Sequence, residues 1–169
     1  MNVVLIGYRG TGKSVVGALL ALHLGMRCVG MDSKIVDRAG MSIPEVVERF
    51  GWTKFRDIES ELVLELSGLD NIVIDTGGGV IERPENIEAL KKNSRIFWLR
   101  ASVDTIVRRI QADTQRPALT TGKTFIEEVA EILEQRISKY KSAAQYEIDT
   151  DALTPEQVAE KIIEILGKE

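Results

Sequence analysis

Residues 7–14 read GYRGTGKS and match G-x-x-x-x-G-K-[ST], the pattern of a glycine-rich loop that binds nucleotide phosphates. We call this segment the phosphate loop. A β-rich run at residues 3–6 leads into it and a helical pattern at 14–24 leads out, so backbone amides and a helix N-terminus point at one anion-sized space. Lys13 is expected to reach the β- and γ-phosphates, and the Ser14 hydroxyl is expected to bind Mg²⁺. The motif therefore predicts a nucleotide site.

The elements that must position the phosphate loop alternate between short strands and longer helices. Strand signals lie at residues 3–6, 27–29, 72–74, 96–99 and 146–148. Three of them are apolar on consecutive positions, which is typical of a parallel sheet covered by helices on both faces. No repeat, low-complexity tract or Pro/Gly linker divides the chain. We therefore expect one three-layer α/β domain over residues 1–169, with right-handed crossovers.

Two helix starts are marked by capping boxes, Ser42 with Glu45 and Thr154 with Gln157. In this motif a hydroxyl accepts from the amide three residues on, and the Glu or Gln side chain reaches back to the first amide. We therefore expect helices to begin directly after Ser42 and Thr154.

A basic segment breaks the acidic pattern of the chain. Residues 108–123 contain four cations and one anion, and they follow an amphipathic helix that is expected to begin near Ser102. We interpret the centre of this segment as a mobile basic loop before a long helix that starts at about Phe125. The alternative interpretation is a solvated surface loop.

The composition of the chain limits its function classes. Its 22 Lys and Arg against 26 Asp and Glu give a net charge of −4, which argues against a nucleic-acid or anionic-membrane partner. The single cysteine, Cys28, excludes an intramolecular disulfide and fits a reducing compartment. The single histidine, His23, excludes multi-histidine metal sites. No leader or membrane span is visible after Met1, so we expect a cytoplasmic enzyme or binding domain.

Six motifs occur in the order and approximate spacing of the shikimate kinases. They are the phosphate loop, Asp32, the FRDIE segment at 55–59, the glycines at 77–79, Arg116 with Pro117, and Arg136 with Tyr140. The chain resembles this family over essentially its whole length. The resemblance implies the P-loop kinase fold, which is a three-layer α/β/α arrangement with a five-stranded parallel sheet and a mobile lid at approximately 112–123.

This resemblance also implies an activity. The chain is expected to phosphorylate the 3-hydroxyl of shikimate with ATP, giving shikimate 3-phosphate and ADP, in the biosynthesis of chorismate and aromatic amino acids. ATP and Mg²⁺ are the implied cofactors, and shikimate is the implied small-molecule partner. We expect no nucleic-acid or membrane partner and a monomeric chain.

The resemblance assigns the acceptor site to residues on four segments. Asp32 contacts the acceptor hydroxyl and serves as the base, because a carboxylate at this end of the sheet can take the hydroxyl proton; alternatively, Asp32 caps a helix that starts near Ser33. Arg56 and Arg136 clamp the substrate carboxylate with paired charge-assisted bonds, and Glu59 holds Arg56 in place. The site also includes Gly77, Gly78 and Gly79, which we call the glycine triplet. These residues have no side chains that would cover their backbone amides, so a small acceptor can lie directly on the main chain.

The donor site implied by the resemblance surrounds the phosphate loop. Lys13, Asp32 and Arg116 are the expected catalytic residues, Arg116 by closing over the transferring phosphoryl group and excluding water. Arg109 and Pro155 are expected to flank adenine, although a helix-surface arginine and a proline in the first helical turn are equally good interpretations. The expected ATP-binding residues are Gly10, Thr11, Gly12, Lys13, Ser14, Val15, Arg109, Arg116 and Pro155.

Two positions depart from the family pattern. The family usually has two aspartates separated by one residue where this chain has Gly30 before Asp32, and the missing carboxylate normally supports the Mg²⁺ shell. We hypothesise that Asp75 takes over this task together with Ser14, since an acid at the end of an apolar strand is how P-loop enzymes hold Mg²⁺. After Arg136 the chain continues Ile-Ser-Lys before Tyr140, where the family tends to have Pro and Leu.

Two other functions remain open from the sequence. One is a related P-loop kinase with another small acceptor, such as gluconate or a nucleoside monophosphate. The other is a non-catalytic nucleotide-binding module, which the glycine at position 30 makes conceivable. Arg56, Arg136 and the glycine triplet favour a carboxylated polyol as acceptor.

Overall fold

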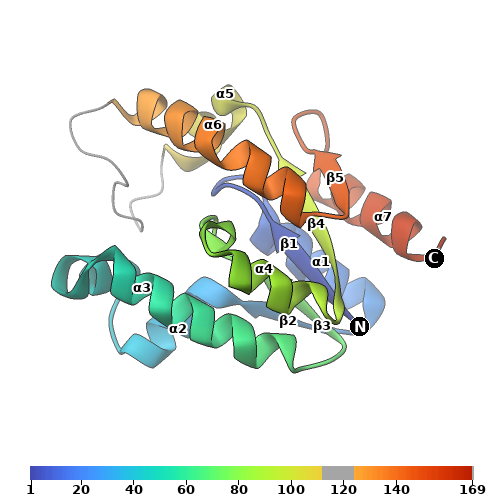
Figure 1. Cartoon of the computed structure of the whole chain (residues 1–169). Coiled ribbons are helices and arrows are strands. Elements are labelled where there is room, and N and C mark those ends of the chain that lie inside the picture. Colours follow the sequence, from blue (N-terminus) through green and yellow to red (C-terminus); the bar gives the residue numbers. More distant parts are fainter. Residues whose placement is uncertain (112–123, 169) are drawn as a thin grey trace.

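Parallel strands form the centre of the computed structural model, which describes residues 1–111 and 124–168. Within these residues one five-stranded sheet has the order β2-β3-β1-β4-β5 (Figure 1). The strands are β1 (Asn2–Ile6), β2 (Arg27–Gly30), β3 (Ile72–Asp75), β4 (Ser94–Arg100) and β5 (Tyr146–Asp149). Every neighbouring pair is parallel. The α/β fold and the parallel sheet expected from the sequence are thus confirmed.

Helices cover both faces of this sheet and complete three layers (Figure 1). In chain order they are α1 (Lys13–Leu24), α2 (Met31–Ala39), α3 (Ile43–Ser67), the 3₁₀ helix η1 (Val80–Glu82), α4 (Pro84–Lys91), α5 (Val103–Ile110), α6 (Phe125–Ala143) and α7 (Pro155–Leu166). The helices α1 and α7 pack on one face. On the other face α4 lies between α3 and α6, which carry two of the predicted site arginines.

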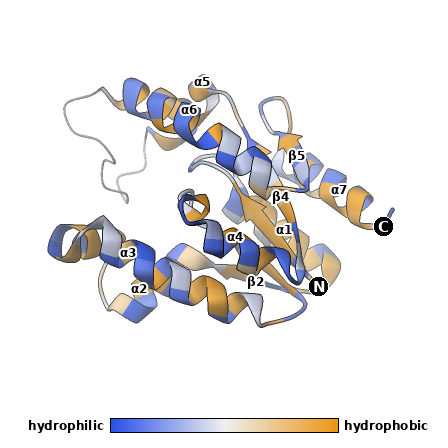
Figure 2. Ribbon diagram, viewed as in Figure 1, coloured by the Kyte–Doolittle hydropathy of each residue, from blue (hydrophilic) through white to orange (hydrophobic). Residues whose placement is uncertain are grey.

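The central strand β1 explains why the strand sequences are apolar on consecutive positions. Val3 and Leu5 pack toward α1 and α7, whereas Val4 and Ile6 pack toward α3 and α4, and all four side chains are fully buried. A strand covered on both faces has no side that favours polar residues. Figure 2 shows the same division, with hydrophobic strands inside and hydrophilic residues on the outer sides of the helices.

Both predicted capping boxes are present. The Ser42 hydroxyl accepts from the Glu45 amide at 3.4 Å and starts α3, and the Thr154 hydroxyl accepts from the Gln157 amide at 3.3 Å and starts α7. In each box the acidic or amide side chain also accepts from the first backbone N–H. These local signals therefore predicted where two helices begin.

The start of α2 differs from the sequence-based alternative. The helix begins at Met31, with Gly30 as its N-cap residue and no side-chain cap. Asp32 lies inside the first turn, so the interpretation of Asp32 as the cap of a helix near Ser33 is wrong. A carboxylate in the first turn remains favourable, because the helix N-terminus carries partial positive charge.

The helix α3 is divided by a kink at Gly51. This residue has φ 81° and ψ 169°, a backbone conformation outside the helical region that glycine adopts without a Cβ penalty. The kink separates the capped first part of α3 from the part that carries Arg56 and Glu59. The direction of the site-bearing part is therefore set by one glycine.

The predicted lid at 112–123, including Arg116, lies outside the described residues. On either side of it, α5 follows its cap residue Ser102 and α6 begins at Phe125, as the sequence predicts. Within the two described stretches of chain, no helix has the length and apolar character needed to cross a membrane.

Candidate active site

The phosphate loop turns tightly between β1 and α1. Gly7 and Gly12 have φ values of 146° and 92°, which favour glycine, and a Cβ on Gly7 would collide with the Leu99 carbonyl oxygen. Lys13 is 8% exposed, and its Nζ donates to the carbonyl oxygens of Gly7 and Tyr8 at 2.9 and 3.0 Å. The loop therefore holds its lysine beside the N-terminus of α1, where an anion is stabilised.

Ser14 and Asp75 meet beside the phosphate loop although they are far apart in the sequence. Ser14 Oγ donates to Asp75 Oδ2 at 2.6 Å. Asp75 ends β3, and the parallel register pairs it with Gly30 of β2. Asp75 therefore lies on the strand next to position 30, and its role as a substitute for the family's carboxylate stays a prediction. A hydroxyl and a carboxylate oxygen are ligands that suit Mg²⁺, so these two residues fit the ion.

Asp32 lies where the donor and acceptor sides of the site meet. A Cβ on Gly77 would be 3.2 Å from Asp32 Oδ1 and 3.0 Å from Glu59 Oε2. A side chain at 77 would therefore push on both carboxylates, each of which would have to shift by a few tenths of an ångström. The close approach brings the carboxylate of α2 against the first residue of the glycine triplet.

Arg56 reaches the glycine triplet from α3. Its guanidinium occupies the place that a Cβ on Gly79 would take, and its NH1 donates to Glu59 Oε1 at 2.8 Å. It also stands over the rings of Phe55 and Trp52, at 5.1 and 5.6 Å from their centroids. The predicted contact between Glu59 and Arg56 is thus present, and it fixes the direction of the guanidinium.

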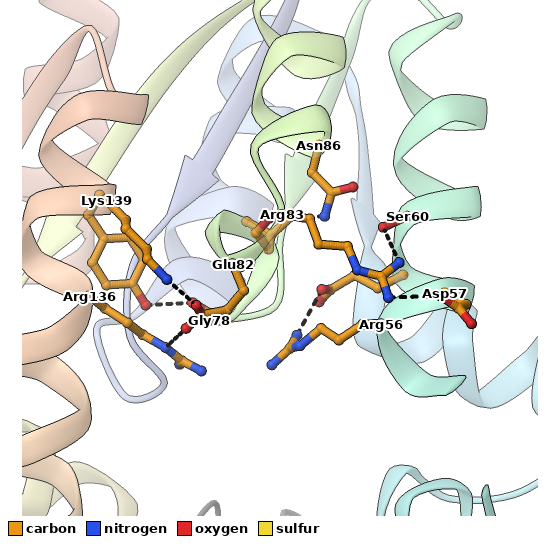
Figure 3. A network of polar contacts seen from close by, with 12 residues as sticks. Arg56, Asp57, Ser60, Gly78, Glu82, Arg83, Asn86, Arg136 and Lys139 are labelled. Carbon is orange, nitrogen blue, oxygen red and sulfur yellow. Dashed lines mark hydrogen bonds and ion pairs between the residues drawn. The ribbon is translucent and has the colours of Figure 1, made fainter. Parts of the chain in front are cut away.

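Arg136 approaches the glycine triplet from the opposite side, on α6. Its Nε donates to Glu82 Oε1 at 2.7 Å, and Tyr140 on the next turn of α6 donates to the Gly78 carbonyl at 2.5 Å. Figure 3 shows the guanidinium groups of Arg136 and Arg56 pointing toward one another across the site. Both arginines therefore lie as a carboxylate clamp would require.

Burial and charge shift the pKa values of the acids in this network. Burial raises the pKa of Glu59, against the opposing effect of Arg56. Burial acts in the same direction on Glu82, but hydrogen bonds from Lys139 and Arg136 outweigh it and lower the pKa of Glu82. The surroundings of Glu82 therefore favour its ionised form beside Arg136, whereas burial disfavours the ionised form of Glu59.

Two cavities meet at the site. The acceptor pocket is lined by Tyr8, Arg9, Ile43, Trp52, Phe55, Arg56, Glu59, the glycine triplet and Arg136. The donor cavity, of about 740 Å³, is lined by residues that include Arg9, Gly10, Gly12, Lys13, Ser14, Val15, Asp32 and Asp75. The acceptor pocket is much narrower, with about 30 Å³ of free space, and the Arg56 guanidinium fills part of it beside Gly79.

The two residues expected near adenine lie beyond these cavities. Arg109 NH1 donates to the Gly10 carbonyl and to Thr150 Oγ1, each at 3.2 Å, so it connects α5 to the phosphate loop. Pro155 is the first residue of α7 and is exposed. Their assignment to adenine stays a prediction. Thr11 is buried, and its hydroxyl donates to the Tyr8 carbonyl at 2.9 Å.

Several residues of the site were not predicted from the sequence. Tyr8 and Arg9 occupy variable positions of the phosphate-loop motif, and the motif says nothing about side chains there. Glu82 carried no signal, because its partners Arg136 and Lys139 lie 54 and 57 residues further along the chain. A long-range pair of this kind is created only by folding.

Comparison with known proteins gives matches over nearly the whole chain. The family model described as SKI, shikimate kinase, matches residues 9–167. A shikimate kinase of Thermodesulfovibrio yellowstonii is 46% identical, over 96% of this chain and 92% of that protein. One from Caldicellulosiruptor bescii is 40% identical, over 99% and 97% of the two chains.

A solved structure agrees with these relatives. The shikimate kinase from Acinetobacter baumannii in complex with shikimate has a TM-score of 0.94 and 30% identity, covering 99% of this chain and 93% of that one. Fold, whole-chain identity and family model thus agree with the resemblance seen in the motifs. The chain belongs to the shikimate kinase family.

Proposed function

We propose that this chain transfers the terminal phosphoryl group of ATP to the 3-hydroxyl of shikimate, giving shikimate 3-phosphate and ADP. The observation that carries the proposal is the pair of guanidinium groups, Arg56 and Arg136, facing each other over the glycine triplet beside the phosphate loop (Figure 3). Such a pair suits one carboxylate on a small acceptor. The structural relative from Acinetobacter baumannii binds shikimate, which supports this acceptor.

On the donor side, the chain contributes charge and backbone donors. The amides of the phosphate loop and the N-terminus of α1 bind the β- and γ-phosphates, and Lys13 moves from its carbonyl partners onto phosphate oxygens. Ser14 and Asp75 would hold Mg²⁺, which neutralises phosphate charge when bound. Arg109 and Pro155 would border the adenine. These contacts position the donor and require no covalent chemistry from the protein.

On the acceptor side, Asp32 acts at the reacting hydroxyl. Its carboxylate lies against Gly77, at the boundary between the donor cavity and the acceptor pocket. It orients the hydroxyl and accepts its proton as the oxygen attacks phosphorus. Arg116, which lies outside the described residues, is proposed to close over the phosphoryl group, to add positive charge there and to exclude water.

A coupled assay of ADP release tests this proposal. We expect turnover with shikimate well above the ATPase background, and none above it with gluconate or a nucleoside monophosphate. Arg56→Met and Arg136→Met should each raise the KM for shikimate about tenfold or more, since each removes charge-assisted bonds. Arg49→Met is the matched control, because Arg49 is an exposed arginine on the same helix as Arg56. Turnover of gluconate instead of shikimate would overturn the acceptor assignment, and no turnover at all would leave only nucleotide binding.

A further inference from the structure

Arg9 occupies a place in the site that the sequence motif leaves undefined. It is a variable position of the phosphate loop, between Tyr8 and Gly10. Among the described residues, Arg9 and Ile43 alone line both the donor cavity and the acceptor pocket. Arg9 is therefore the one cation in the described chain that borders both.

The described residues around Arg9 leave its Nε without a hydrogen bond. The side chain is 14% exposed, and its Nε is buried without a hydrogen bond to any described residue. Its NH2 lies 4.0 Å from Glu128 Oε1, and its guanidinium stands 5.6 Å over the Phe125 ring. Charge-assisted hydrogen bonds are typically 2.7–2.9 Å long, so the contact with Glu128 is a loose ion pair. These contacts hold the arginine at the start of α6, where it also interacts with the adjacent Tyr8 hydroxyl.

The backbone at Arg9 lies directly against the glycine triplet. A Cβ on Gly78 would be 3.4 Å from the Arg9 amide nitrogen and 3.5 Å from the Gly7 carbonyl oxygen. The phosphate loop and the acceptor-binding backbone thus touch at this residue. The boundary between the donor cavity and the acceptor pocket therefore runs beside Arg9.

We propose that the Arg9 guanidinium binds the phosphoryl group during transfer and then binds the phosphate of the product. This inference rests on the proposed function. The bond from the γ-phosphorus to the β–γ bridging oxygen breaks while a bond from the acceptor 3-oxygen to phosphorus forms. The hydroxyl proton goes to Asp32, and the electron pair of the broken bond stays on ADP. Arg9 interacts with the oxygens of the phosphoryl group, where charge is spread in the transition state.

Arginine suits this task better than lysine would. Its planar fork donates two parallel hydrogen bonds to a phosphate and remains charged in a half-buried place. Lys13 serves the donor phosphates from the base of the loop, whereas Arg9 borders the acceptor side as well. The inference therefore predicts that Arg9 discriminates the phosphorylated product from the unphosphorylated acceptor.

Binding measurements with Arg9→Met and Arg9→Lys test this role. Dissociation constants are measured by calorimetry for shikimate, shikimate 3-phosphate and ADP, together with kcat. For Arg9→Met we expect kcat to fall, and the dissociation constant for shikimate 3-phosphate to rise, about tenfold or more, because a charge-assisted contact is lost. The constants for shikimate and ADP should change less than about threefold. Arg9→Lys should recover part of the loss, since it keeps the charge without the fork.

The Glu128→Gln variant separates phosphate binding from the loose ion pair. It should keep product affinity, because Arg9 retains its charge. If Glu128→Gln lost as much affinity for shikimate 3-phosphate as Arg9→Met does, the loss would come from the ion pair, and the inference would be overturned. The inference would also be overturned if Arg9→Met lost affinity for shikimate and for shikimate 3-phosphate to the same extent, or lost affinity for neither. A wild-type chain that does not turn over shikimate would contradict the proposed function and this inference together; an unaffected Arg9→Met with an active wild type would contradict the inference alone.

Discussion

At the scale of single residues, the position of Asp75 supports the hypothesis that it supplies the carboxylate that this chain lacks at position 30. The family pattern has an acid at position 30, and this chain has glycine there. Because neighbouring parallel strands lie about 4.8 Å apart, the register partner of Gly30 can place a carboxylate close to the same point. Asp75 is that partner, and its Oδ2 already accepts from the Ser14 hydroxyl at 2.6 Å.

This hypothesis predicts that a change at Asp75 alters the Mg²⁺ requirement. Asp75→Asn should raise the Mg²⁺ concentration for half-maximal activity about tenfold or more, because an amide oxygen is a weaker ligand than a carboxylate. Adding Gly30→Asp to this variant should lower that Mg²⁺ concentration again, since it places a carboxylate on the adjacent strand. Steady-state rates titrated with Mg²⁺ measure both.

Asp149→Asn is the control for this titration, because Asp149 ends β5 at the far edge of the sheet and is exposed. It should leave the Mg²⁺ requirement unchanged. An unchanged requirement in Asp75→Asn would instead show that Asp75 takes no part in holding the ion.

Asp32 is expected to govern the chemical step more than binding. Asp32→Asn keeps the shape of the side chain but cannot accept the hydroxyl proton, so kcat should fall about 100-fold or more while the KM for ATP changes little. Asp104→Asn, an exposed change on α5, is the control. A kcat that stays within about twofold of wild type would remove Asp32 from the role of base.

At the scale of elements, α3 does the most to build the acceptor pocket. Its start is fixed by the Ser42 capping box, and its direction changes at Gly51 before it delivers Arg56 and Glu59. On the other side α6 delivers Arg136 and Tyr140, and the Tyr140 hydroxyl holds the Gly78 carbonyl. The glycine triplet is thus held between two helices that come from distant parts of the sequence.

The capping box of α3 gives a stability prediction. Ser42→Ala removes the acceptor for the Glu45 amide and should lower the free energy of unfolding by about 1 kcal/mol. Urea unfolding of both proteins measures this difference. Ser138→Ala, an exposed change inside α6, removes a hydroxyl without a cap and should cause no loss. Equal stability of wild type and Ser42→Ala would show that α3 does not depend on its cap.

At the scale of the whole molecule, the free energy of unfolding depends on the protonation of Glu59, the buried acid in the site. Burial raises the folded-state pKa of Glu59 above its ordinary value of 4.5, and Arg56 only partly opposes this. The folded protein therefore binds this proton more tightly than the unfolded chain does. The resulting stabilisation is fully present below pH 4.5 and is lost as pH rises through the folded-state pKa.

Glu59→Gln should remove this pH dependence. The free energy of unfolding of wild type minus that of Glu59→Gln should decrease as pH rises from about 4.5 toward 8, and urea unfolding at several pH values measures it. Other titrating groups cancel in this difference. Glu61→Gln, an exposed change on the same helix, is the control variant. A difference that grows with pH would contradict the raised pKa.

Local signals predicted much of the fold and part of the site. Consecutive apolar residues located the strands, and the capping boxes located the starts of α3 and α7, because both depend on residues close together in the chain. Lys13 and Ser14 were found for the same reason. The predicted start of α2 near Ser33 was wrong. Gly30, the actual N-cap residue, has no side chain that could mark the helix start, and Asp32 in the first turn is a residue type that often caps helices.

The sequence by itself determined the nucleotide loop, the parallel α/β fold and, through motifs in register, the shikimate kinase family. Each of these depends on residue types at fixed spacing. Only the tertiary structure decided that Gly30 pairs with Asp75, that Arg56 faces Arg136, and that Arg9 borders both cavities. The physical reason is that strand register and helix packing bring together residues whose separation in the chain carries no information about their distance in space.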